Sequence, residues 1–321
     1  MVDLVMSVGK TLLVFQPNLI ALAWIFAAAG LSVSNWYGSN DFFWIKDWNL
    51  QTVLLFVGIT LLMAGANLLA QFDQHSKEQT PSYPSNIELA NTIRESIPRL
   101  APALIIVGYL MIIPGGILSA LAGFLATLVL WLLYGSNAIL WRDNNVVQST
   151  MQILVGMFFF AVGWGRGDAP ILAIFTLSIP YTLILIVLSL TVVFALGDTT
   201  QATKHVGQIL VGVCTVSLVG AMSLAYSLGD PLGSTAPALM LPFYIVALIR
   251  GGRIDILRSF RYSLLVMTIF TGARYPYLFL PIIIVFYLSR FYYSRTHGLA
   301  YPTLEGPEWS DGVAKSTAKD S

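Results

Sequence analysis

The sequence predicts an all-α, polytopic transmembrane helical bundle. Hydrophobic residues make up 56% of the 321 positions, and charged residues make up only 10%. Soluble globular proteins carry about 25% charged residues, so this chain lacks the charge needed to cover a water-facing surface. The apolar residues also gather into runs of about 20, the length that crosses the hydrocarbon core as a helix. These two observations predict a protein that spans the bilayer several times.

The apolar runs predict about nine core helices and one additional C-terminal helix. The expected spans are 12–33, 52–72, 100–115, 117–135, 149–165, 170–196, 206–227, 234–250, 255–273 and 276–293. Proline and glycine mark the turns at Pro114-Gly115-Gly116, Gly165–Asp168 and Gly229-Asp230-Pro231. A hairpin at Gly272–Pro276 is expected, because one long span would place Arg274 at mid-membrane at a cost of about 3 kcal/mol. Residues 1–300 are therefore expected to form one domain, followed by a polar, disordered cytoplasmic tail at 301–321.

Lysine and arginine divide unequally between the two sets of loops. One set carries ten, namely Lys10, Lys77, Arg94, Arg99, Arg142, Lys204, Arg250, Arg253, Arg258 and Arg261. The opposite set carries three: Lys46, Arg166 and Arg274. The positive-inside rule makes the first side cytoplasmic. We therefore expect a multi-pass integral membrane protein, in the plasma (inner) membrane if the source is bacterial.

Composition also bears on the partners. The formal net charge is only +1, so nothing points to nucleic acid, and the expected surroundings are the lipid bilayer. The single cysteine, Cys214, excludes an intramolecular disulfide.

Three connecting segments are longer than turns. Gln74–Arg99, with an amphipathic helix expected at Asn86–Ile97, and Gly251–Tyr262 both lie on the predicted cytoplasmic side. We interpret them as basic segments on anionic headgroups, or alternatively as lids over a cytoplasm-facing site. Asn35–Asn49 is rich in Trp and Phe and is expected to form an aromatic belt at the opposite interface.

Two predicted spans end in an aspartate on the same side of the membrane. Asp73 ends the second span and Asp198 ends the sixth, and four crossings, an even number, separate them. Lys77 follows Asp73, Lys204 follows Asp198, and Arg142 stands in the loop after the fourth span. The simpler interpretation is that the interface tolerates charge, so that spans commonly end in such residues.

The functional interpretation of these residues is diphosphate chemistry. Magnesium binds one or two carboxylates together with substrate phosphates, which makes Asp73 and Asp198 candidate catalytic and metal-binding residues. Cationic and amide side chains hold the remaining phosphate oxygens, and the candidates are Asn67, Lys77, Arg142 and Lys204. A diphosphate that leaves an allylic prenyl chain generates a carbocation, which aromatic faces stabilise. The candidate aromatic residues are Phe158, Phe159, Phe160, Trp164, Tyr181 and Phe194.

An ordered set of motifs over residues 12–275 resembles the UbiA superfamily of intramembrane aromatic prenyltransferases. The matching segments are Gln16-Pro17-Asn18, Ala66–Asp73, Leu133–Ser136 with Trp141-Arg142, Gly156, Gly163-Trp164 and Gly197–Lys204. The second and the last of these resemble the two Asp-rich motifs of the family. The resemblance implies a UbiA-like bundle, a cytoplasm-facing site, Mg²⁺ as cofactor, and a prenyl diphosphate and a hydrophobic acceptor as substrates.

The Asp-rich motifs carry fewer carboxylates than the family pattern. Leu69 and Ala70 stand where Asn-Asp is expected, Lys77 stands where a third acidic residue is common, and Phe194 replaces the first Asp of the second motif. About one carboxylate remains in each motif, compatible with a single shared Mg²⁺.

Three functions fit this sequence. The favoured one is an enzyme that transfers an isoprenoid group from a prenyl diphosphate to an aromatic or lipid acceptor, as in quinone, lipid or pigment biosynthesis. The alternative is a catalytically degenerate UbiA-like protein that binds an isoprenoid, quinone or pigment, or that is a subunit of a membrane complex. A transporter is disfavoured, because the charges lie at the ends of spans and not near the midplane.

Overall fold

The described part of the chain is a bundle of α-helices. The computed structural model describes residues 17–39, 49–77, 97–134, 145–196, 204–284 and 287. In chain order the elements are α2 (Pro17–Ser39), α3 (Leu50–Lys77), α5 (Ile97–Ile112), the 3₁₀ turn η1 (Ile113–Gly115), α6 (Ile117–Tyr134), α8 (Asn145–Trp164), η2 (Ile171–Ala173), α9 (Ile174–Leu177), α10 (Ile179–Leu196), α11 (Lys204–Ser227), α12 (Pro231–Arg250) and α13 (Arg253–Arg274). Residues 276–284 are also helical. The predicted all-α class is confirmed.

Most of these helices have the length and apolar character of membrane spans. Within the described residues, six helices meet both conditions, and the pair Ile171–Leu177 and Ile179–Thr191, bent by 53°, makes a possible seventh. The apolar part of α6 is shorter, at Ile117–Leu132. The ninth predicted span belongs to α13, whose first three turns carry four charged residues, so it is more polar than expected. The protein is a multi-pass integral membrane protein.

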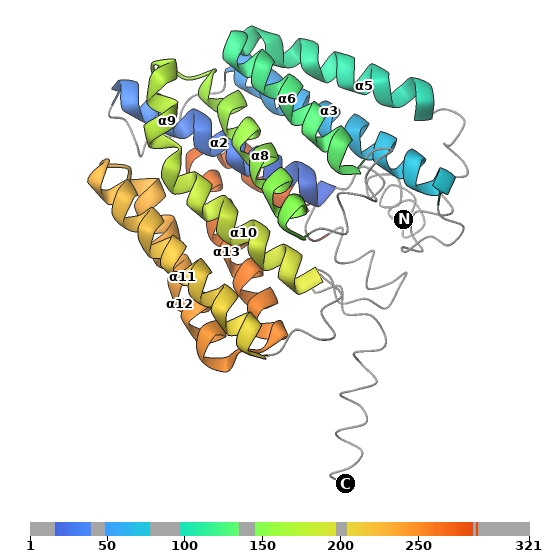
Figure 1. Cartoon of the computed structure of the whole chain (residues 1–321). Coiled ribbons are helices and arrows are strands. Elements are labelled where there is room, and N and C mark those ends of the chain that lie inside the picture. Colours follow the sequence, from blue (N-terminus) through green and yellow to red (C-terminus); the bar gives the residue numbers. More distant parts are fainter. Residues whose placement is uncertain are drawn as a thin grey trace.

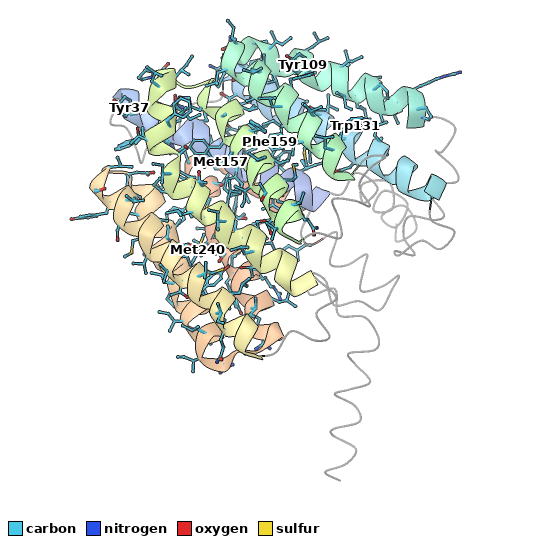
Figure 2. All side chains as sticks on the ribbon, in the orientation of Figure 1. Tyr37, Tyr109, Trp131, Met157, Phe159 and Met240 are labelled. Carbon is cyan, nitrogen blue, oxygen red and sulfur yellow. The ribbon has the colours of Figure 1, made fainter. Side chains whose placement is uncertain are left out.

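Helix α2 lies at the centre of the bundle, and α8 packs along it. Helix α2 packs against α8, and α8 also contacts α6 and α10 (Figure 1). Helices α3, α5 and α6 cover one side, and α10, α11, α12 and α13 pack on the other. Figure 2 shows Phe159 of α8 in the middle of the bundle, whereas Trp131 lies on the outer helix α6 and is 49% exposed. The large exposed side chains of the outer helices are mostly apolar, as contact with lipid requires.

The predicted turns are present where proline and glycine mark them. Gly116 follows η1 with φ of 96°, a conformation that an L side chain rarely adopts. The 165–168 turn lies beside it, and Arg166 donates a hydrogen bond from Nη1 to the Pro114 carbonyl oxygen at 3.0 Å. At the α11–α12 connection, Gly229 has φ of 73° and Asp230 caps α12. These connections all lie at the same end of the bundle.

Two boundary predictions require correction. Helix α2 continues through Asn35 to Ser39, because Ser34 accepts a hydrogen bond from the Ala169 backbone amide and Trp36 packs on the core. Only residues 35–39 and 49 of the predicted aromatic belt are described. Most of the predicted surface segment Gly251–Tyr262 is the start of α13. The expected hairpin break is present at Tyr275, and Arg274, the residue before it, is buried at 4% exposure.

Glycines bring the backbones of α2 and α8 into contact. A Cβ atom on Gly30 would overlap the Phe160 carbonyl oxygen, and one on Gly163 would overlap the Ala27 carbonyl oxygen. Gly58 and Gly108 meet in the same way between α3 and α5. Lipid tails are as apolar as the helices, so van der Waals packing over such close approaches holds membrane helices together.

The α2–α8 contact predicts that Gly163→Ala destabilises the fold. The added methyl group has no space against the Ala27 carbonyl, and overpacking of this kind costs about 1–3 kcal/mol. The matched control is Gly212→Ala on α11, where the nearest atom to the new Cβ is Leu248 Cδ1 at 3.9 Å. Thermal unfolding in detergent should show a lower midpoint for Gly163→Ala only. Equal midpoints for the two variants would contradict the packing argument.

The α11–α12 connection predicts a pH-dependent stability. Asp230 is buried, and its oxygens accept hydrogen bonds from the Tyr181 hydroxyl at 2.9 Å and from the Leu232 and Gly233 amides at 3.0 Å. Burial raises the pKa of the Asp230 carboxyl above its usual range, although these hydrogen bonds lower it. Stability from the protonated form is therefore lost as pH rises through the raised pKa.

The variant Asp230→Asn removes this titration but keeps an oxygen acceptor. We expect the unfolding midpoint of the natural protein, relative to Asp230→Asn, to be highest in acid and to fall as pH rises above the ordinary range of a carboxyl group. Thermal unfolding of both proteins across pH in one detergent measures this difference. A difference that grows with pH would reverse the predicted sign.

Candidate functional site

The predicted diphosphate-binding residues belong to helix ends on one side of the bundle. Helix α3 ends at Lys77, α10 ends at Leu196, and α11 begins at Lys204. Figure 1 shows these three ends at the same end of the bundle. The opposite end of the bundle holds the connections at 113–116, 165–168 and 229–231. The helical architecture therefore agrees with the prediction that both motifs face one side of the membrane.

The described residues include only part of the predicted site. Asp73 and Lys77 lie in the last two turns of α3 and Lys204 is the first residue of α11, but the positions of these three side chains are outside the described part. Arg142 and Asp198 lie wholly outside the described residues, as does the predicted helix at 86–97. Asn67, one and a half turns before Asp73, is buried at 1% exposure. The roles of all six residues remain predictions.

A Mg²⁺ site depends on the same residues. Among the described side chains, no three from His, Cys, Asp and Glu come together as a metal site. The donor set implied by sequence is one carboxylate from each junction. Because Mg²⁺ keeps several waters and takes substrate phosphates as ligands, two carboxylates suit an ion that arrives with a diphosphate better than a resident all-protein site.

An apolar cavity lies in the interior between six helices. Its volume is about 140 Å³, and its lining comes from Leu22, Ala23, Phe26, Met63, Leu130, Gln152, Val155, Gly156, Phe159, Leu185, Leu188, Ser189 and Phe260. An engineered cavity of about this size in another protein stays dry and binds benzene. The cavity therefore suits a small apolar group, such as part of a lipid chain.

The cavity lies next to the contact between α2 and α8. The two helices touch through Ala27, Gly30, Phe160 and Gly163, and the cavity residues precede this contact on both helices. Gly156 lets the Leu185 side chain pack directly against the α8 backbone in the cavity wall, since a Cβ atom there would meet that side chain at 2.4 to 2.9 Å.

The cavity lies close to the end of the bundle that carries the predicted diphosphate-binding residues. Leu22, Leu130, Gln152, Ser189 and Phe260 each lie within two turns of the end of their helix on that side.

Two walls of the cavity lead directly to the two predicted motifs. Helix α3 contributes Met63, and Asp73 follows ten residues later, about 15 Å along the helix. Helix α10 contributes Ser189 and ends at Leu196, two residues before Asp198 in the sequence. The helices that line the cavity thus also carry the candidate carboxylates.

One polar pair interrupts the apolar lining. The Ser189 hydroxyl lies 3.0 Å from Gln152 Oε1 and 3.1 Å from the Ser149 carbonyl oxygen, to either of which it can donate. Neither residue was singled out from the sequence, because an isolated Gln or Ser in an apolar run gives no signal of the cavity that it faces.

The aromatic residues divide into two groups. Phe159 lines the cavity, together with Phe26 and Phe260, which sequence reasoning missed because nothing local distinguishes them from other core residues. Phe160, Trp164 and Tyr181 instead form a buried cluster of tilted rings, with centroids 5.0 Å apart for Phe160–Tyr181 and 6.1 Å for Phe160–Trp164. Tyr181 joins this cluster to Asp230 at the far end of the bundle.

Comparison with known proteins identifies the fold. No protein-family model matches the sequence, and no curated protein is significantly similar to it. A solved structure of a digeranylgeranylglyceryl phosphate synthase, a UbiA-family prenyltransferase, matches with a TM-score of 0.60 over 85% of this chain and 99% of that chain. The sequence identity over the match is 12%, so the likeness concerns the fold. The expected helical membrane fold is thereby confirmed: this protein shares the fold of that synthase, which agrees with the resemblance of its motifs.

Proposed function

We propose that this protein is a membrane prenyltransferase, which moves an isoprenoid group from a prenyl diphosphate to an aromatic or lipid acceptor. The observation that carries the proposal is the apolar cavity whose α3 and α10 walls lead to Asp73 and to the segment of Asp198. The fold, shared with a prenyltransferase, supports the same conclusion. In the proposed complex the diphosphate lies at the helix ends and the apolar chain enters the cavity.

Each group in the proposed site has a distinct task. Lys77, Arg142 and Lys204 bind the diphosphate oxygens, and Asp73 and Asp198 would hold Mg²⁺. When bound, the ion supplies positive charge that stabilises the diphosphate as a leaving group. The apolar lining excludes water from the allylic cation that forms when the C–O bond breaks. Phe26, Phe159 and Phe260 line the cavity and would stabilise that cation until the acceptor bonds to it and gives up a proton, which the released diphosphate takes.

The cavity predicts that a larger side chain at Ala23 weakens substrate binding. Ala23→Leu adds volume inside the lining, and overfilling costs about 1–3 kcal/mol, so KM for prenyl diphosphate should rise about tenfold or more. Ala103→Leu makes the same change on the lipid-exposed surface of α5 and should leave KM unchanged. Steady-state kinetics at varied prenyl diphosphate concentration distinguishes the two variants. An unchanged KM in a folded Ala23→Leu protein would remove the cavity from substrate binding.

The proposed roles of Asp73 and Asp198 predict that removing either carboxylate slows diphosphate release. With prenyl diphosphate, Mg²⁺ and candidate aromatic acceptors, Asp73→Ala and Asp198→Ala should each lower diphosphate release about 100-fold or more, the usual loss when a charge-stabilising group is removed. If both residues act on one ion, the double variant is hardly slower than either single variant. Asp168→Ala, at the opposite end of the bundle, is the control. Release that is equal in the natural protein and the double variant would contradict the enzyme assignment.

A specific observation favours the second candidate, a non-catalytic isoprenoid-binding relative. Leu69, Ala70, Lys77 and Phe194 replace residues that would supply oxygen ligands in the resembled motifs. The two candidates differ in one outcome: stabilisation of the protein by a prenyl diphosphate that Ala23→Leu abolishes, without any diphosphate release, identifies a binding protein.

A further inference from the structure

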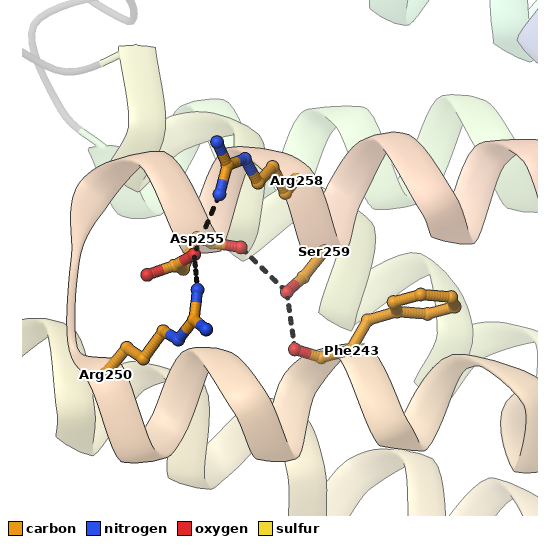
Figure 3. Close-up of polar contacts among 5 residues, drawn as sticks. All are labelled: Phe243, Arg250, Asp255, Arg258 and Ser259. Carbon is orange, nitrogen blue, oxygen red and sulfur yellow. Dashed lines mark hydrogen bonds and ion pairs between the residues drawn. The ribbon is translucent and has the colours of Figure 1, made fainter.

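The α12–α13 turn gathers two arginines around one carboxylate. Gly251 ends α12 in the left-handed conformation, with φ of 65°, and reverses the chain into α13. Arg250 Nη1 lies 3.6 Å and Arg258 Nη1 lies 3.4 Å from the same oxygen, Oδ1 of Asp255 (Figure 3). Two positive charges and one negative charge leave this cluster with a formal charge of +1. The arginine–aspartate cluster, Arg250, Asp255 and Arg258, therefore presents positive charge at one end of the bundle.

Both guanidinium groups face the surroundings. The side chains of Arg250 and Arg258 are 63% and 55% exposed, whereas that of Asp255 is 17% exposed. Exposed ion pairs of this kind contribute little to stability, so stabilisation does not account for the arrangement. Planar guanidinium groups bind phosphate oxygens in bidentate fashion, and two of them held at one point suit a phosphate.

An apolar surface continues from the two arginines along the lipid-facing sides of both helices. On α13, Arg258 is followed at helical spacing by the exposed Tyr262, Leu265 and Ile269. On α12, Phe243 and the exposed Val246 precede Arg250 with the same spacing.

The two helices are joined directly below the arginines. The rings of Phe243 and Tyr262 stack at 4.5 Å with an interplanar angle of 17°. The Ser259 hydroxyl lies 2.9 Å from the carbonyl oxygens of both Phe243 and Asp255 (Figure 3). The apolar side chains of α12 and α13 thus form one continuous surface, and the two positively charged arginines lie at its end.

We propose that this surface is a binding site for an anionic phospholipid. The phosphate contacts Arg250 and Arg258, and the acyl chains lie along the Phe243–Tyr262 stack and Leu265. Charge selects the lipid: an anionic headgroup complements the net positive cluster, whereas a zwitterionic headgroup also brings a cation toward the guanidinium groups. The site uses none of the residues of the proposed diphosphate site and does not depend on prenyl transfer.

The test compares lipids that differ only in headgroup charge. The full-length protein is purified in a neutral detergent, and its unfolding temperature is measured with phosphatidylglycerol and with phosphatidylcholine of the same acyl chains. A ligand that binds the folded state raises this temperature, so phosphatidylglycerol should give the larger increment. Arg250→Gln with Arg258→Gln should remove at least roughly half of the difference between the lipids. Arg166→Gln, at the opposite end, should retain it.

A second variant separates lipid binding from a structural role. Asp255→Asn removes the carboxylate that competes with phosphate for the guanidinium groups, so the phosphatidylglycerol increment should increase. A merely structural ion pair would give a protein with lower stability in both lipids and no larger increment, which would overturn the proposal. An undiminished increment in the double arginine variant, or an equal increment with inorganic phosphate alone, would also overturn it.

Discussion

The close approach of α2 and α8 is the contact on which the rest of the structure depends. In a bilayer the helices gain little from burying apolar surface, so contact between backbones must supply the association energy. Gly30 and Gly163 permit that contact because neither has a side chain to hold the helices apart. The cavity-lining residues of α2 and α8 precede this contact in both helices. The cavity therefore lies directly beside the glycine contact.

The two ends of the bundle differ in their construction. At one end, Arg166 bonds to the Pro114 carbonyl and Asp230 accepts from Tyr181, so turns and neighbouring helices are tied by buried or short polar contacts. At the other end, the helices carry the candidate diphosphate residues and the exposed arginine–aspartate cluster. A closed end and a charged end on opposite sides of an apolar cavity are the arrangement that a two-part substrate, with a charged head and an apolar chain, requires.

The sequence was sufficient for the fold class and most of the turns, because apolar length and the proline and glycine breaks are local properties. The sequence did not predict the features that depend on packing between helices. Asn35 remains helical because α2 packs on the α8–α9 connection, where Ser34 accepts a hydrogen bond from the Ala169 amide, and the burial of Arg274 was not predicted. The cavity residues Phe26 and Phe260 were missed for the same reason: only the packing of six helices distinguishes them from other apolar residues. Asp73 and Asp198 were found by their position at the ends of spans, and that prediction still stands untested.

We propose that one substrate bridges the two carboxylates and the cavity. A crystal structure with a non-reactive prenyl diphosphate analogue and Mg²⁺ would locate each part of that substrate. We expect the diphosphate between Asp73 and Asp198, with their carboxylates about 10 Å or less apart, as Mg²⁺–oxygen distances allow, and the chain against Phe159. Carboxylates separated far beyond that distance, or an analogue whose chain lies outside the cavity, would contradict it.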